Sequence, residues 1–379
     1  MANTIAALLN GRDNNFHLIR FMAASAVILD HSVVLVAPDR LGAFSSVEQL
    51  ELGRLAVDAF FIVSGFLVTR SVMTQPTLAD YAVARCLRLF PALLTVCIFI
   101  AFLLGPLVTL VFWQDYFADP RVWLFVPATA SLITHSLTLP GVFDQLPQSG
   151  LIDPPLWTLR YETMCYVLLA IFALFGMLAT RARAGVTLAL VLGGYLVITF
   201  ATSAREIAAI ESAARFVLGF FVGGALYLFA GKIRLNLVAV LLLGLLAIAA
   251  YGTPVYEMAL RLALGYGLIW FALVPSGPIR AFNQIGDYSY GLYILCFPIQ
   301  QTFVMLDPTI TPGWLLLCSF PAVLAFAMLS WHFIEHPALR RKAWAGDCVG
   351  SLLHGAQQRL ASAVGVGTMT KAQASTGGR

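Results

Sequence analysis

The first long apolar stretch of the chain, at residues 16–37, contains Arg20, Asp30 and His31. Ionisable side chains are costly inside a membrane span, so each of them is a candidate functional residue. Arg20 and His31 are eleven residues apart, which places them within about 20° of one helix face and roughly 16 Å apart along the axis. This helix would present a cation near one end and, deeper in, an imidazole that can act as a general base. The structural alternative is an interfacial arginine and a histidine that is hydrogen-bonded to a neighbouring helix.

The second apolar stretch, at 54–73, contains an acid and a small polar pair. We predict that Asp58 orients His31 from an adjacent helix, because Asp30 points about 100° away from that histidine. Ser64 follows Asp58 by about one and a half turns and is a candidate to bind substrate. Alternatively, Ser64 and Gly65 form only a notch against which another helix packs.

A pair of arginines lies near the start of the third stretch. Arg85 and Arg88 are three residues apart and therefore share one helix face. Two adjacent guanidinium groups suit the phosphate groups of a ligand, and Arg20 is a candidate third cation. The alternative is that the pair only anchors the helix at the cytoplasmic side of the membrane.

Polar and aromatic side chains open the fourth stretch, directly after two prolines. Glu162 lies about one turn into the membrane, where a hydroxyl group arriving from the other side would meet it. Trp157 and Tyr161 could instead belong to an aromatic belt at the interface. We predict that the substrate that carries this hydroxyl group is bound by five residues. They are Trp157, Arg160, Tyr161, Glu162 and Ser64.

A literal metal-binding pattern, H-x-x-E-H, occurs at His332, Glu335 and His336. We interpret it as a coincidence, because it lies at the end of the last apolar stretch, precedes Pro337 and has no evident third ligand. We therefore predict no metal site. The six cysteines form no C-x-x-C pair, which argues against a disulfide framework and against a zinc ribbon.

The composition defines the elements that must position these side chains. Of the 379 residues 60% are hydrophobic and only 11% are charged, which predicts an all-α integral membrane protein. The net charge of +4 is too small to indicate binding to nucleic acid. A span of about 20 apolar residues crosses the bilayer, and we predict ten of them. They lie at 16–37, 54–73, 87–112, 157–178, 185–203, 212–230, 235–251, 256–274, 288–306 and 313–335.

The distribution of charge predicts the orientation of the spans. Arginine and lysine gather in one set of loops, which places these loops and both termini in the cytoplasm. We predict a cytoplasmic segment at 1–15, a transmembrane domain at 16–337 with an outward loop at 113–156, and a disordered cytoplasmic tail at 338–379. We expect no appended soluble domain. The prolines of 121–139 favour a re-entrant or interfacial piece over an eleventh span.

Taken in order, these motifs resemble the acyltransferase 3 family of multi-span membrane enzymes, which O-acylate cell-surface glycans. The resemblance extends from about residue 15 to 337. It implies that His31 is the essential histidine, that Arg20 is its partner and that Arg85 and Arg88 contact the acyl donor. One departure is Cys296, where many members have a histidine. The motifs are Arg20 and His31, Asp58 to Gly65, Arg85-x-x-Arg88-Leu-Phe-Pro, Trp157-Thr-Leu-x-x-Glu162, Tyr288-Ser-Tyr-Gly-Leu-Tyr293 and Phe333-Ile-Glu335-x-Pro337.

The resemblance implies an O-acyltransferase in the cytoplasmic membrane that has no bound cofactor and uses acyl-CoA, by default acetyl-CoA, as co-substrate. The expected acceptor is a sugar hydroxyl of exopolysaccharide, lipopolysaccharide or a lipid-linked precursor. We expect His31 to deprotonate this hydroxyl, although a covalent acyl-enzyme intermediate stays open. The alternative from another class is a proton-coupled glycolipid transporter, in which the ionisable residues of the spans form a pathway.

Overall fold

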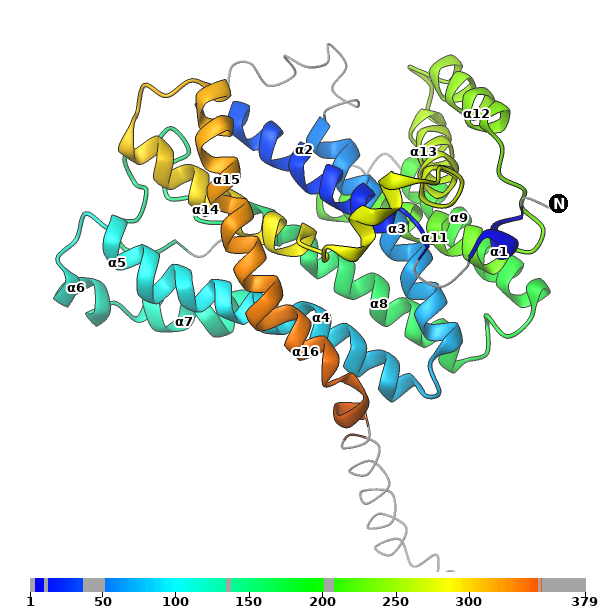
Figure 1. Cartoon of the computed structure of the whole chain (residues 1–379), viewed down its shortest axis with the longest axis horizontal. Helices are drawn as coiled ribbons and strands as arrows, with labels where there is room; N and C mark the ends of the chain where they lie inside the picture. The colour runs from blue at the N-terminus through cyan, green and yellow to red at the C-terminus, as the bar shows by residue number, and fades with distance from the viewer. Residues whose placement is uncertain are drawn as a thin grey trace, which may run out of the picture.

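A computed structural model describes residues 4–9, 13–36, 52–133, 138–200, 208–346 and 349, and these residues form helices and connecting loops without a β-strand (Figure 1). The long helices are α2 (Phe16–Val36), α3 (Leu52–Thr74), α4 (Leu78–Phe99), α8 (Leu159–Leu174), α9 (Arg181–Phe200), α11 (Ala208–Leu228), α12 (Leu237–Ala249), α13 (Tyr256–Leu273), α14 (Ser289–Leu306) and α15 (Pro312–Ser330). The shorter helices are α1 (Ile5–Leu8), α5 (Gly105–Val108), α6 (Trp113–Ala118), α7 (Pro120–Ala130) and α16 (His336–Arg340), with 3-10 turns η4 (Pro154–Thr158) and η5 (Pro278–Gln284).

Among the described residues, seven helices are long and apolar enough to cross a membrane, or eight if α13 and η5 are counted as one bent span. The protein is therefore an all-α, multi-pass membrane protein. Each of the ten predicted stretches falls on a helix, but α12 has only 13 residues and α14 does not meet the same test of length and hydropathy. The count of ten spans and the orientation stay predictions. The boundaries at 15 and 337 stay predictions in the same way.

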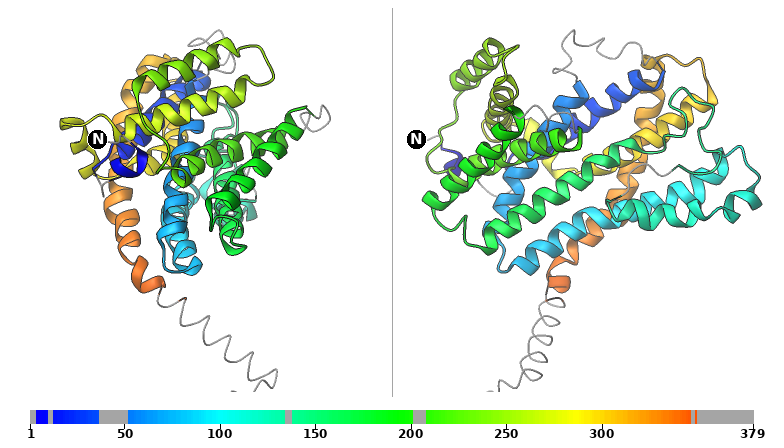
Figure 2. Two further views of the ribbon diagram at one scale, coloured as in Figure 1. Left: turned by 90° about the vertical axis from the view of Figure 1, so that its right-hand side faces the viewer. Right: turned by 180° about the vertical axis from the view of Figure 1, so that it is seen from behind.

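The segment 121–139 forms one short helix in its described part. Helix α7 has 11 residues, too few to cross the bilayer, and it packs beside α4. With α5 and α6 it lies at one edge of the molecule, and α12 lies at the opposite edge (Figure 2). Residues 134–137, like most of the predicted disordered tail, lie outside the described part of the chain.

Two proline-containing helices continue past their prolines through a π-turn. Helix α4 runs through a π-turn at Ile100–Leu104 into α5, and α15 runs through one at Trp331–Glu335 into α16. Pro337 lies in the first turn of α16, which continues to Arg340. The helix thus runs five residues past the predicted end of the last apolar stretch at 335.

Close packing of α3 against α11 forms the centre of the bundle. A Cβ atom added at Gly65 would lie 1.8 Å from the carbonyl oxygen of Phe220, and one added at Gly223 would lie 1.9 Å from that of Ile62. Only glycine lets the two backbones approach this closely. Of the two readings of the Ser64 and Gly65 pair, Gly65 is thus the packing residue. Helix α14 is buried along almost its whole length, whereas most of α9 faces outward.

Substitution of Gly223 by alanine tests this packing. The added methyl group must push α3 and α11 apart, so we expect Gly223→Ala to lower the free energy of unfolding by about 1–3 kcal/mol. Thermal unfolding in detergent micelles measures the change. Among the described residues, no atom lies within 4 Å of a Cβ added at Gly244 of α12. Gly244→Ala is therefore the matched control and should not lower the melting temperature, because alanine favours a helix interior over glycine. Equal melting temperatures for both variants would contradict the close contact.

Candidate active site: a cavity lined by three arginines

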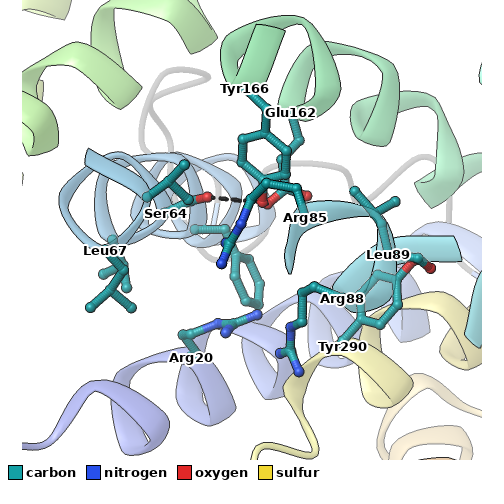
Figure 3. A pocket seen from close by; sticks show the side chains of 12 residues that line it. Arg20, Ser64, Leu67, Arg85, Arg88, Leu89, Glu162, Tyr166 and Tyr290 are labelled. Carbon is teal, nitrogen blue, oxygen red and sulfur yellow. Dashed lines mark hydrogen bonds between the residues drawn. The ribbon is translucent and has the colours of Figure 1, made fainter. Parts of the chain in front are cut away.

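Five helices converge on a cavity in the interior of the bundle (Figure 3). It contains about 490 Å³ of space that no atom fills, part of which is open to solvent. Three cations face it, Arg20 from α2 and Arg85 and Arg88 from α4. Ser64 of α3 and Glu162 of α8 face the same space. The remaining lining residues are Phe60, Val63, Leu67, Val68, Leu89, Tyr166 and Tyr290.

Two of the three cations are paired with acids. One carboxylate oxygen of Asp287, just before α14, accepts hydrogen bonds from Arg20 at 2.6 Å and from Arg88 at 2.5 Å. Arg88 also contacts Glu335 at 3.3 Å, and Glu335 in turn accepts a hydrogen bond from Ser330. An arginine side chain is long and flexible. The ion pairs with Asp287 and Glu335 fix the positions of these two guanidinium groups.

Burial alone would raise the pKa of Asp287, but the charges of Arg20 and Arg88 outweigh it and hold that pKa below its ordinary value. Asp287 is therefore ionised at neutral pH. A buried carboxylate bound by two guanidinium groups joins α2, α4 and the start of α14 at one point.

Arg85 differs from the other two arginines. It makes no ion pair within 4 Å with any acid in the described part of the chain. Its guanidinium lies 5.7 Å from the centre of the Tyr166 ring, and its Nε atom is buried without a hydrogen-bond partner among the described residues. A half-buried cation that faces a cavity and has no acid partner is the feature expected of an anion-binding side chain.

Ser64 and Glu162 belong to one hydrogen-bonded group. The Ser64 hydroxyl donates to Glu162 Oε1 at 3.2 Å and lies 3.3 Å from the hydroxyl of Tyr166, which also donates to Glu162. The predicted acceptor-side residues Ser64 and Glu162 thus share a cavity with the predicted donor-side arginines. A donor bound at these arginines would therefore also contact the cavity wall that carries Ser64 and Glu162.

A second cavity of about 430 Å³ shares Arg20, Phe60 and Glu162 with the first. Thr158 and Tyr293 also line it, and their hydroxyl groups are 2.8 Å apart. Tyr290 lines both cavities as well, so the two cavities adjoin between the arginines and η4.

His31 does not line either of these two cavities. Its ring packs edge-on against Phe297 at 5.4 Å between centres, and its Nδ1 atom is buried without a hydrogen-bond partner among the described residues. His31 lies on the same helix as Arg20, about three turns further along it. Arg20 and His31 therefore lie on one helix, as predicted. His31 is not in contact with Ser64 or Glu162.

The expected pairing of Asp58 with His31 is not formed. Asp58 accepts a hydrogen bond from Arg215 at 2.9 Å and contacts Arg261 at 3.5 Å. Arg261 also pairs with Glu257. The two guanidinium groups of α11 and α13 occupy both oxygens of Asp58, so this acid balances cations and does not orient the histidine.

The other predicted acceptor-binding residues face away from the arginine cavity. Trp157 and Tyr161 pack against each other and against Phe216. Arg160 donates to the Tyr161 hydroxyl at 2.6 Å and lines an apolar groove between α8, α9 and α11. The sequence predicted that these three residues bind the acceptor together with Ser64 and Glu162, but they do not line the arginine cavity.

The H-x-x-E-H residues have separate partners. Glu335 contacts Arg88 and Ser330, and the His332 ring lies 3.3 Å from the Tyr288 hydroxyl. The His336 ring packs against Trp331. Glu335 thus belongs to the arginine cluster, a role that the sequence pattern did not suggest.

Comparison with known proteins identifies the class to which this membrane protein belongs. Residues 13–332 match the acyltransferase domain family, acyltransferase 3, so the chain belongs to that family and is an acyltransferase. It is similar to an O-acetyl transferase of Shigella phage Sf6, with 26% identity over 348 residues that cover 88% of this chain and 98% of the relative. It is also similar to nodulation protein 10 of Rhizobium leguminosarum bv. viciae, with 27% identity over 359 residues, 87% of this chain and 94% of the relative. No solved structure matches significantly.

Removal of the Asp287 charge tests the ion-pair cluster. Asp287→Asn leaves two buried cations without their shared partner, so we expect the free energy of unfolding to fall by about 3 kcal/mol. Thermal unfolding in detergent checks this value. The control is Asp119→Asn, which removes a charge from an exposed ion pair with Arg121 and should not change the melting temperature. An unchanged melting temperature for Asp287→Asn would show that the cluster contributes nothing.

Proposed function

We propose that the protein is an O-acetyltransferase that moves an acetyl group from acetyl-CoA to a hydroxyl group of a cell-surface glycan. The observation that carries the proposal is Arg85, a cation without an acid partner among the described residues, in a cavity that also contains Ser64 and Glu162. The relative from phage Sf6 that is named an O-acetyl transferase supports acetyl as the transferred group.

The donor would bind through its phosphate groups. Arg85 is the principal contact, because Arg20 and Arg88 already share their charge with Asp287 and Glu335. Acetyl-CoA is made in the cytoplasm, so we place this cavity toward the cytoplasm and the protein in the cytoplasmic membrane. The basic loops predicted to be cytoplasmic agree with this orientation.

The acetyl group would then react deeper in the membrane. From Arg20, His31 lies about 16 Å along the helix, a distance that the extended pantetheine arm would cover. We propose that His31 takes the proton of a sugar hydroxyl, whose oxygen attacks the thioester carbon. The C–S bond breaks, and the proton passes to the departing thiolate.

Ser64 offers a second route for the same overall reaction. Its hydroxyl donates to Glu162, which could accept the proton if Ser64 attacked the thioester first. An acetyl-serine intermediate would then transfer its acetyl group to the sugar. Sequential kinetics would support the direct route and ping-pong kinetics the covalent route. Membership in an acyltransferase family favours either of these two routes of acetyl transfer over the alternative function of a glycolipid transporter.

The role of His31 is tested by its removal. We expect His31→Ala to reduce acetyl transfer by about 100-fold or more, because a general base contributes that much to the rate. Proton NMR of surface polysaccharide from cells that lack the gene and carry the variant measures the acetyl content. Ser25→Ala, on the same helix, should restore acetylation fully at the same protein level. Full acetylation with His31→Ala would exclude this histidine as the base.

Arg85 is tested by donor kinetics. We expect Arg85→Ala to raise the KM for acetyl-CoA about tenfold, since one charge-assisted contact to phosphate is lost, and to change kcat little. Arg85→Lys should recover part of the loss. The matched control is Arg341→Ala, which removes an exposed arginine outside the cavity. A donor KM that is the same for Arg85→Ala and the unaltered protein would contradict the phosphate assignment.

A further inference from the structure

The segment that follows the last long helix packs along the first half of α4. Glu335 contacts Arg88 at 3.3 Å, and α16 lies beside α4 (Figure 1). At the other end of this segment, a Cβ atom added at Gly346 would overlap the carboxylate of Asp80. Arg88 and Asp80 both belong to α4. The segment from Glu335 to Gly346 is therefore held against α4 at two points, one on either side of Arg85.

Lys342 lies between these two points. It is half-buried and belongs to a helical turn after α16, in which the Ala345 N–H donates to the carbonyl oxygen of Arg341 at 2.9 Å. Burial and the charge of Arg85 lower the pKa of Lys342, whereas the charge of Asp80 raises it. Charged side chains influence one another in this way only at short range. Lys342 is thus a second cation beside Arg85, close to Asp80 and hence toward the start of α4.

No acid of the described part of the chain neutralises this pair of cations. Neither Arg85 nor Lys342 has an ion-pair partner within 4 Å there. The carboxylate of Asp80 instead accepts a hydrogen bond from the Thr77 hydroxyl at 2.8 Å, at the start of α4. Two like charges that are close together repel each other, and a bound anion would remove this cost. The pair is therefore suited to a ligand that carries more than one phosphate group.

The order of the cations along α4 matches the order of the groups along CoA. Arg85 and Arg88 line the arginine cavity, and Lys342 does not. In CoA, a diphosphate separates the pantetheine arm from an adenosine, whose ribose carries a further phosphate group at its 3′ position. If the arm points into the membrane and the diphosphate lies at Arg85, the 3′-phosphate lies outside the cavity, toward Lys342.

We propose that Lys342 binds the 3′-phosphate of the CoA donor, so that the segment after the last long helix forms part of the donor site. An ammonium group is a compact charge with three N–H donors, which suits a terminal phosphate. This inference rests on the proposed function, in which acetyl-CoA is the donor. A phospholipid headgroup offers the same chemistry, because basic residues near a membrane surface attract anionic lipids.

The test measures the binding of CoA and of 3′-dephospho-CoA to the full-length protein in detergent, by isothermal titration calorimetry. The two ligands differ only in the phosphate group that is assigned to Lys342. We expect the unaltered protein to bind 3′-dephospho-CoA about tenfold more weakly than CoA, since one charge-assisted hydrogen bond is missing. Lys342→Ala should weaken CoA binding by the same factor and leave the Kd of 3′-dephospho-CoA unchanged. Arg85→Ala should weaken the binding of both ligands.

Two further variants serve as controls. Lys342→Arg keeps the charge and should retain most of the preference for CoA. Lys232→Ala removes an exposed lysine from another basic loop, so both Kd values should match those of the unaltered protein.

Three results would overturn the inference. The first is an unaltered protein that binds both ligands equally well. The second is an unchanged preference for CoA in Lys342→Ala, which is the result expected if this lysine contacts lipid. The third is an equal loss of affinity for both ligands in Lys342→Ala, which would place the lysine at the diphosphate. Failure of the unaltered protein to bind CoA at all would instead overturn the proposed function.

Discussion

The need to neutralise arginine inside a membrane is the constraint on which the structure depends. Arg20 and Arg88 lie in apolar helices, and both are balanced by Asp287, which begins the mostly buried helix α14. Glu335 adds a second acid from the end of the last long helix. Because one small cluster joins residues from four segments, it sets the relative positions of α2, α4, α14 and the π-turn after α15.

The same constraint distinguishes structural cations from functional ones. Asp58 is matched with Arg215 and Arg261, as Asp287 is matched with Arg20 and Arg88. Arg85 faces a cavity without such an acid among the described residues, so an anion from outside the protein would complete its environment. Asp153 shows the reverse case, since it is a buried acid without a hydrogen-bond partner among those residues.

Hydropathy and helical periodicity predicted much of the fold and part of the site. The ten apolar stretches fall on helices, and Arg20, Ser64, Arg85, Arg88 and Glu162 line one cavity. Periodicity relates residues within a helix, but it does not give the rotation of one helix against another, which is why Asp58 could not be separated from His31. Asp287 was missed because it lies between two apolar stretches, where an acidic residue is common and does not by itself indicate a function. Arg215 and Arg261 could have been found, because both are cations inside apolar stretches.

The central claim is that the donor reacts from one side of the membrane and the acceptor from the other. Sealed membrane vesicles of known orientation, with the de-O-acetylated glycan enclosed on the side away from the arginine cavity, test it most directly. Radiolabelled acetyl-CoA, which does not cross the bilayer, is then added only on the side of the arginine cavity. The account predicts labelled acetyl esters on the enclosed glycan. Labelling only when donor and glycan are on the same side would contradict it.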